Sequence, residues 1–129
     1  MPAIYQTAEE DFDNARYVLA ARSYEIYLRD YPSKSNDDRI LFRLGLCYSL
    51  ADSSAAGLRK ARDRFERLIG LYPDSPYKPQ AKVIMALQDQ IEQKAAELQN
   101  NEERIRQLTE ELNKLKKIDM QRQPSRPPR

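Results

Sequence analysis

The side chains that most often carry catalysis are scarce in this chain. The 129 residues contain no histidine, which excludes most acid–base pairs and most imidazole metal sites. The single cysteine, Cys47, falls on the apolar side of an expected helix, where a thiol packs as a small hydrophobic group. We therefore expect Cys47 to be structural rather than nucleophilic.

Carboxylates are also poorly placed for chemistry. Several acidic residues occur as consecutive pairs, which point to different sides of a helix and suit solvated faces. Examples are Glu9-Glu10, Glu102-Glu103 and Glu110-Glu111. With only three glycines, the chain has no glycine-rich loop of the kind that binds phosphate. These observations predict a protein that is not an enzyme and has no catalytic residues, no cofactor and no metal.

A segment that occurs twice is more informative. Residues 20–32 align with residues 61–73 after a shift of 41 positions. The two copies share a small residue, an aromatic residue four later, an aliphatic residue four after that, and a closing Tyr-Pro. This spacing marks one face of a helix that stops at proline. Repetition at this length indicates stacked helical hairpins, an architecture that usually holds other proteins.

Apolar spacing along the chain predicts an all-α fold, with two helical hairpins followed by a long helix. The expected helices cover residues 3–13, 17–31, 37–51, 58–72 and about 79–118. We divide the chain into a helical repeat domain (1–90), a long helix (77–118, with a coiled-coil pattern from about residue 84) and a disordered basic tail (119–129). No apolar run approaches the roughly 20 residues of a membrane span.

The second hairpin resembles the tetratricopeptide repeat. The residues that carry the resemblance are Leu41, Leu44, Gly45, Tyr48, Ala61, Phe65, Leu68 and Pro73. In that motif the glycine lets the two helices approach, and we expect Ala61 to pack into the gap. The first hairpin departs from the motif, because Ala8 stands at the glycine position and Asp11 where an aromatic residue is expected.

The loop Tyr-Pro-Asp-Ser-Pro-Tyr (72–77) narrows the resemblance to repeat proteins of the bacterial envelope. It is similar to loops of the BamD-type outer-membrane assembly lipoproteins and the YbgF/CpoB-type periplasmic proteins. This resemblance, over roughly residues 5–90, implies a scaffold of the periplasm or outer membrane. The alternative is a cytoplasmic location, because the first residues do not have the pattern of a signal peptide.

A groove built by the first helix of each hairpin is the expected partner site of such an array. By repeat position, it would carry Tyr5, Glu9, Phe12, Arg39, Phe42, Leu46 and Ser49. Phe42 lies about 100° from the apolar stripe of its helix, and an exposed aromatic residue in a groove suits peptide capture. Otherwise, Phe42 is buried under the N-terminal helix or the start of the long helix.

The long helix carries a heptad pattern with Ile84 at position a. The expected coiled-coil interface consists of Ile91, Leu98, Asn101, Ile105, Leu108, Leu112 and Leu115. About 40 Å of helix follows Ile91, which two hairpins are too small to cover, so this stripe needs another chain. We favour a homo-oligomer; a different coiled-coil partner and folding back onto the repeats are the alternatives.

The charges that flank the stripe do not decide which chain is its partner. In a parallel homodimer Glu97 would face Glu102 and repel it, whereas Glu111 and Lys116 would attract. The basic tail is a solvated end, a contact for an acidic partner or membrane surface, or a polyproline ligand. It lacks the interleaved aromatic residues that favour nucleic-acid binding, so we expect no nucleic acid.

The expected function is that of an adaptor for protein partners. Its groove would bind a partner protein, and its coiled coil would oligomerise, in cell-envelope assembly by resemblance. The alternative is a structural or regulatory subunit that binds a heterologous coiled-coil partner and has no functional groove.

Overall fold

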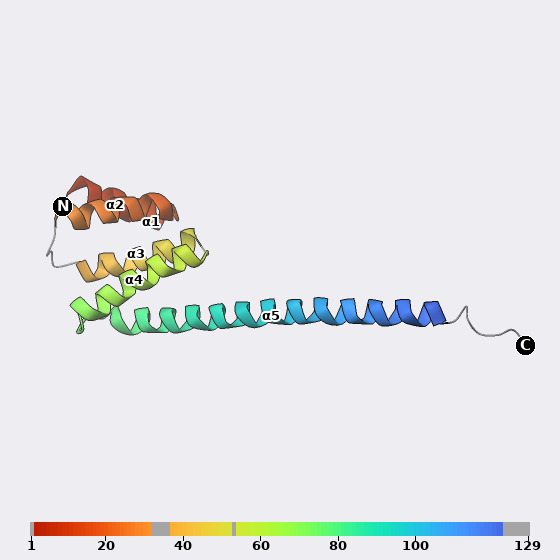
Figure 1. The fold of residues 1–129 in the computed structure, drawn as a ribbon. Helices are drawn as coiled ribbons and strands as arrows, with labels where there is room; N and C mark the ends of the chain where they lie inside the picture. The colour runs from red at the N-terminus through yellow and green to blue at the C-terminus, as the bar shows by residue number, and fades with distance from the viewer. Residues whose placement is uncertain (1, 32–36, 53, 123–129) are drawn as a thin grey trace, which may run out of the picture. The chain divides into compact units, whose positions relative to one another are not determined.

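The computed structural model describes residues 2–31, 37–52 and 54–122, and every regular element in these ranges is an α-helix. The elements are α1 (Ala3–Asp13), α2 (Tyr17–Asp30), α3 (Asp37–Ala51), α4 (Ala55–Leu71) and α5 (Lys78–Arg122) (Figure 1). The all-α prediction and the long C-terminal helix are confirmed. The loop at 32–36 and the part of the expected disordered tail after residue 122 lie outside the described ranges.

Two helix boundaries differ by more than one residue from the sequence-based expectation. α4 begins at Ala55, three residues before the expected start, because the Ser54 side chain accepts a hydrogen bond from the Gly57 N–H at 3.4 Å. α5 extends to Arg122, four residues beyond the expected end at 118. The chain divides into two compact units, Met1–Gln88 and Asp89–Arg129. The first unit contains the four short helices and the first turns of α5.

The turn between α1 and α2 ends α1 with a left-handed residue, Ala15, whose φ is 61°. The Arg16 N–H donates to the Asp11 carbonyl at 2.8 Å, and the Ala15 N–H donates to the Phe12 carbonyl at 3.0 Å. This is the Schellman pattern of helix termination. The buried Asp11 carboxylate also pairs with Arg16 Nε at 2.8 Å. Asp11 therefore secures the turn from the position where the repeat motif has an aromatic residue.

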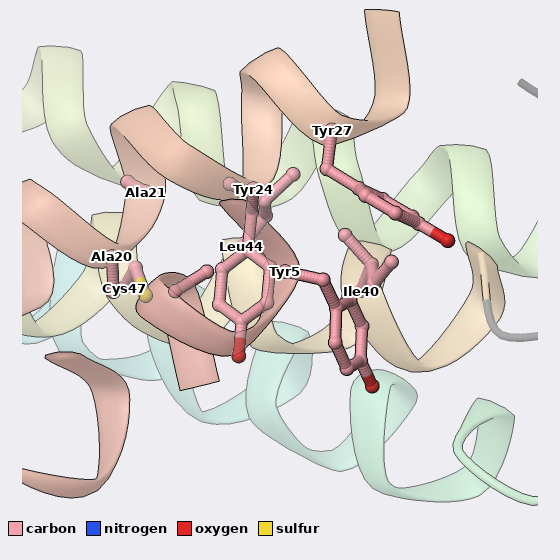
Figure 2. Close-up of a cluster of buried hydrophobic side chains, with 9 residues drawn as sticks. Tyr5, Ala20, Ala21, Tyr24, Tyr27, Ile40, Leu44 and Cys47 are labelled. Atoms are coloured by element: carbon pink, nitrogen blue, oxygen red, sulfur yellow. The ribbon is translucent and has the colours of Figure 1, made fainter. Parts of the chain in front are cut away.

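The first core lies between α1, α2 and α3 and combines small residues with tyrosines (Figure 2). Its buried members are Tyr5, Ala8, Ala20, Ala21, Tyr24, Tyr27, Ile40, Leu44 and Cys47. The alanines let the helices approach, and the tyrosine rings fill the space that remains. Cys47 is completely buried, as its spacing predicts, and this burial raises the pKa of its thiol to about 12.

The second core joins α3, α4 and the start of α5 around Ala61, Phe65 and Ala81. Gly45 allows the close approach, because a Cβ built there would overlap the Phe65 ring. The expectation that Ala61 fills this gap needs correction, since the nearest atoms all belong to Phe65. A ring, rather than a methyl group, thus occupies the space that the glycine leaves.

The first turns of α5 cover the second hairpin. Ser75 Oγ, in the turn before α5, donates to Asp38 Oδ2 at 2.5 Å. Ala81 is fully buried in the second core, and Gln88 Nε2 donates to Ser49 Oγ at 2.6 Å. This part of α5 packs as a capping helix on the hairpins.

Candidate protein-binding surfaces

A polar network centred on Glu9 occupies the α1 and α3 side of the expected groove. Arg39 Nη2 and Arg43 Nη1 lie 2.8 and 3.1 Å from Glu9 Oε2. The Tyr24 hydroxyl donates to Glu9 Oε1 at 2.5 Å, and Arg39 Nη1 donates to the Tyr5 hydroxyl at 2.8 Å. These five residues, which we call the Glu9 cluster, link the first three helices.

Together with Asp13, the Glu9 cluster is electrostatically balanced. Arg43 also lies 3.9 Å from the Asp13 carboxylate, so two guanidinium groups face two carboxylates. The Arg43 guanidinium stacks over the Phe12 ring, 4.4 Å from its centroid. Burial, together with the Glu9 carboxylate, raises the pKa of Tyr24 far above its usual value, so this hydroxyl remains a donor at neutral pH. The arrangement holds the helices together and presents a polar surface of fixed geometry.

The other three expected groove residues lie at the second core or contact residues at the start of α5. The Phe42 ring stacks on Tyr77 with centroids 5.2 Å apart, and it lies 5.9 Å from the Phe65 ring. Leu46 packs against the second core. Ser49 Oγ donates to the Gly45 carbonyl at 2.8 Å and accepts from Gln88. The seven groove residues therefore fall into two groups: Tyr5, Glu9, Phe12 and Arg39 around the Glu9 cluster, and Phe42, Leu46 and Ser49 beneath α5.

Phe42 also lines a shallow apolar depression of about 440 Å³. The other residues that line it come from the first turns of α5: Pro79, Gln80, Val83 and Ile84. Val83 is 58% exposed although it is apolar. Such a depression, open to solvent and lined by carbon, suits an apolar side chain from a partner. We call it the Phe42 depression.

A second surface is the apolar stripe on α5 beyond the first unit. Its large apolar members are each more than half exposed: Ile91, Leu98, Ile105, Leu108, Leu112 and Leu115. Burying each of these side chains would contribute about 1.5–3 kcal/mol. Asn101 is exposed on the same stripe, and Ile118 lies one turn past Leu115. Among the described helices, none is long and apolar enough to cross a membrane.

A match to a known protein family establishes the family to which the chain belongs. Residues 2–118 match the sequence pattern of the YfiO family, described as outer membrane lipoproteins. This chain belongs to the YfiO family. The match includes both hairpins and α5 as far as Ile118, so the long helix lies within the family's pattern. No curated protein and no solved structure matches the chain.

Membership of the YfiO family supports the BamD-type part of the resemblance, and the YbgF/CpoB type stays a prediction. For this YfiO-family chain, sequence analysis missed Arg43, Pro79 and Val83. Arg43 is a charged residue on a helix, a position that usually means a solvated side chain. Of these three residues, only Val83 could have been recognised from the sequence, because it is a branched apolar residue adjacent to the heptad stripe rather than on it.

Proposed function

We propose that this YfiO-family protein is a non-enzymatic scaffold in outer membrane assembly. It binds a partner protein on its hairpin unit and associates with further chains through α5. Family membership supports the envelope role. The observation that carries the proposal is the α5 stripe, on which six large apolar side chains repeat at heptad spacing and are 51–63% exposed.

The two surfaces have different tasks in this scaffold. On the hairpin unit, the Glu9 cluster offers hydrogen-bonding groups of fixed geometry, and the Phe42 depression receives an apolar anchor. On α5, the stripe brings several hairpin units together. Linked sites bind a multivalent partner more strongly than one site does, so association through α5 raises the strength of capture.

The association step is tested by Leu108→Asp combined with Leu112→Asp in the full chain. Both leucines are more than half exposed, so the single chain keeps its helices, whereas a charge buried in a helix pair is strongly unfavourable. We expect the mass in sedimentation equilibrium to fall to that of one chain, with little change in circular dichroism. A variant with Gln107→Asp and Asn113→Asp has the same added charge off the stripe and should keep the mass of the unmodified chain. An unchanged mass for the leucine variant would contradict the proposal.

A second candidate function is a structural subunit whose stripe binds a heterologous helix while the hairpin surface has no partner. Capture from a membrane extract separates the two functions when three full-chain variants are compared. The scaffold proposal expects Val83→Glu, in the Phe42 depression, to lose a protein that the double leucine variant still captures. Val18→Glu on α2, a valine of similar exposure, is the control. If only the leucine variant loses a captured protein, the second function holds.

A further inference from the structure

The two parts of α5 beyond residue 88 have opposite net charge. Residues 89–103 contain five acidic residues and one lysine, a net charge of −4. Residues 104–122 contain six basic and three acidic residues, a net charge of +3. Every residue from Ile91 to Arg122 is exposed. The charged residues at the e and g positions flank the apolar stripe and act beside it: Glu97, Glu102, Arg104, Glu111 and Lys116. The helix is thus polarised along its length.

This polarity favours one orientation for a second copy of the chain. A parallel pair would set the acidic part beside the acidic part and the basic part beside the basic part, and would place Lys94 opposite its own copy. An antiparallel pair sets each acidic part beside a basic part, where opposite charges attract. The charges next to a helix–helix seam select the partner and its orientation in this way.

We propose that the α5 stripe pairs with a second copy of this chain in the antiparallel orientation. This inference rests on the self-association proposed above. In an antiparallel pair, each a position packs against a d position of the other helix. The register that pairs Ile105 with Leu108 at the centre gives these further layers: Leu98 with Leu115, Asn101 with Leu112, and Lys94 with Asp119. It also places Arg104 beside Glu111, twice by symmetry.

Registers shifted by one heptad are less favourable, because they bring like charges together. A shift of one heptad in one direction brings Arg104 beside Arg104 of the second copy, and a shift in the other direction brings Glu111 beside Glu111. The proposed register has two kinds of mismatched layer, each of which occurs twice by symmetry. Asn101 faces Leu112 instead of its own copy, and Ile91 faces Arg122 towards the end of the helix. A parallel pair gains the Asn101 hydrogen-bonded layer and two attractive contacts of Glu111 with Lys116, but it also sets Glu97 beside Glu102 twice. The antiparallel register has four opposite-charge contacts, two of Lys94 with Asp119 and two of Arg104 with Glu111.

Distances between spin labels test the orientation. The full chain with Cys47→Ala is labelled at one new cysteine, either Gln107→Cys near the centre of the stripe or Gln93→Cys near its start. In the antiparallel register the two copies of residue 107 lie at the same height, so the label distance stays under about 25 Å. The two copies of residue 93 are separated by roughly 40 Å along the axis. Short distances at both positions mean a parallel pair and overturn this inference alone. A mass of one chain overturns the self-association and this inference together.

A charge exchange gives a second test that needs no label. Arg104→Glu should weaken the dimer roughly tenfold, because two attractive contacts become repulsive. Adding Glu111→Arg should restore the affinity in the antiparallel register. In a parallel pair Glu111 faces Lys116 instead, so the second substitution would weaken the dimer further, and that result would overturn the proposal. Sedimentation equilibrium of the full-length variants measures the three affinities.

Discussion

At the scale of single residues, the hairpin unit depends on small side chains that admit large ones from a neighbouring helix. Gly45 on α3 is the clearest case, because the Phe65 ring of α4 occupies the space where a Cβ would stand. Phe65 is fully buried and touches Phe42, which connects this packing to the Phe42 depression. The fit of one ring against one backbone therefore influences the shape of a candidate binding surface.

Gly45→Ala should lower the free energy of unfolding by about 1–3 kcal/mol, because the new methyl group must displace the Phe65 ring. Gly70→Ala is the matched control, since a Cβ at Gly70 meets no atom within 4 Å. That control should raise stability by about 0.5–1 kcal/mol, because alanine favours a helix more than glycine does. Urea unfolding followed by circular dichroism measures both changes. Equal effects for the two glycines would contradict the packing described.

Tyr48 gives a prediction about alkaline pH. Its hydroxyl donates to Glu25 Oε1 at 3.1 Å, and burial, followed by the Glu25 carboxylate, raises its pKa from 10.0 to about 12. The fold therefore favours the protonated hydroxyl. This contribution to stability is complete below pH 10 and is lost as the pH rises towards 12. We expect the melting temperature to fall across that window, and to fall less steeply in Tyr48→Phe. The same slope in the variant would argue against the raised pKa.

At the scale of elements, periodicity predicted the helices well and their contacts less well. The spacing of apolar residues gave the bounds of α1, α2 and α3 to within one residue. The start of α4 was missed because residues 52–57 are small and polar enough to indicate a loop, whereas Ser54 caps the helix there. The local sequence shows which face a helix buries. It does not readily distinguish a serine that caps a helix from a serine in a loop.

The sequence predicted some members of the candidate groove but not the contacts between its helices. Repeat position identified Glu9 and Arg39, which form an ion pair across α1 and α3. It could not show that Arg43 joins the same carboxylate, because this pairing depends on how two helices cross. The contact of Phe42 with Tyr77 likewise depends on how α5 starts after the turn at 72–77. Both contacts are long-range in sequence, and no local pattern records them.

The link between α1 and α3 can be tested through Glu9. Glu9→Gln removes the charge that both Arg39 and Arg43 face, and should lower the free energy of unfolding by about 1–3 kcal/mol. Glu10→Gln makes the same change at an exposed neighbour and should have little effect. Thermal unfolding of both variants gives the comparison. If Glu9→Gln is as stable as Glu10→Gln, the Glu9 cluster does not hold the two helices together.

At the scale of the whole molecule, the two units differ in how completely they bury their apolar residues. In the hairpin unit two cores bury tyrosines, Phe65 and small residues. In the second unit, residues 91–122 are all exposed, and their apolar side chains have no cover from the described part of this chain. In the proposed scaffold, such a helix gains its tertiary stabilisation from another chain. Association through α5 is therefore the central claim.

The most direct test of that claim is the mass in solution of the full chain beside a chain that ends at Gln93. The shorter chain retains the compact unit Met1–Gln88, so it should keep its helices. Sedimentation equilibrium over a concentration series should give twice the single-chain mass of 15.1 kDa for the full protein and the mass of one chain for the shorter one. A full chain that stays at 15.1 kDa at every concentration would contradict self-association and direct the search to a different helix as partner.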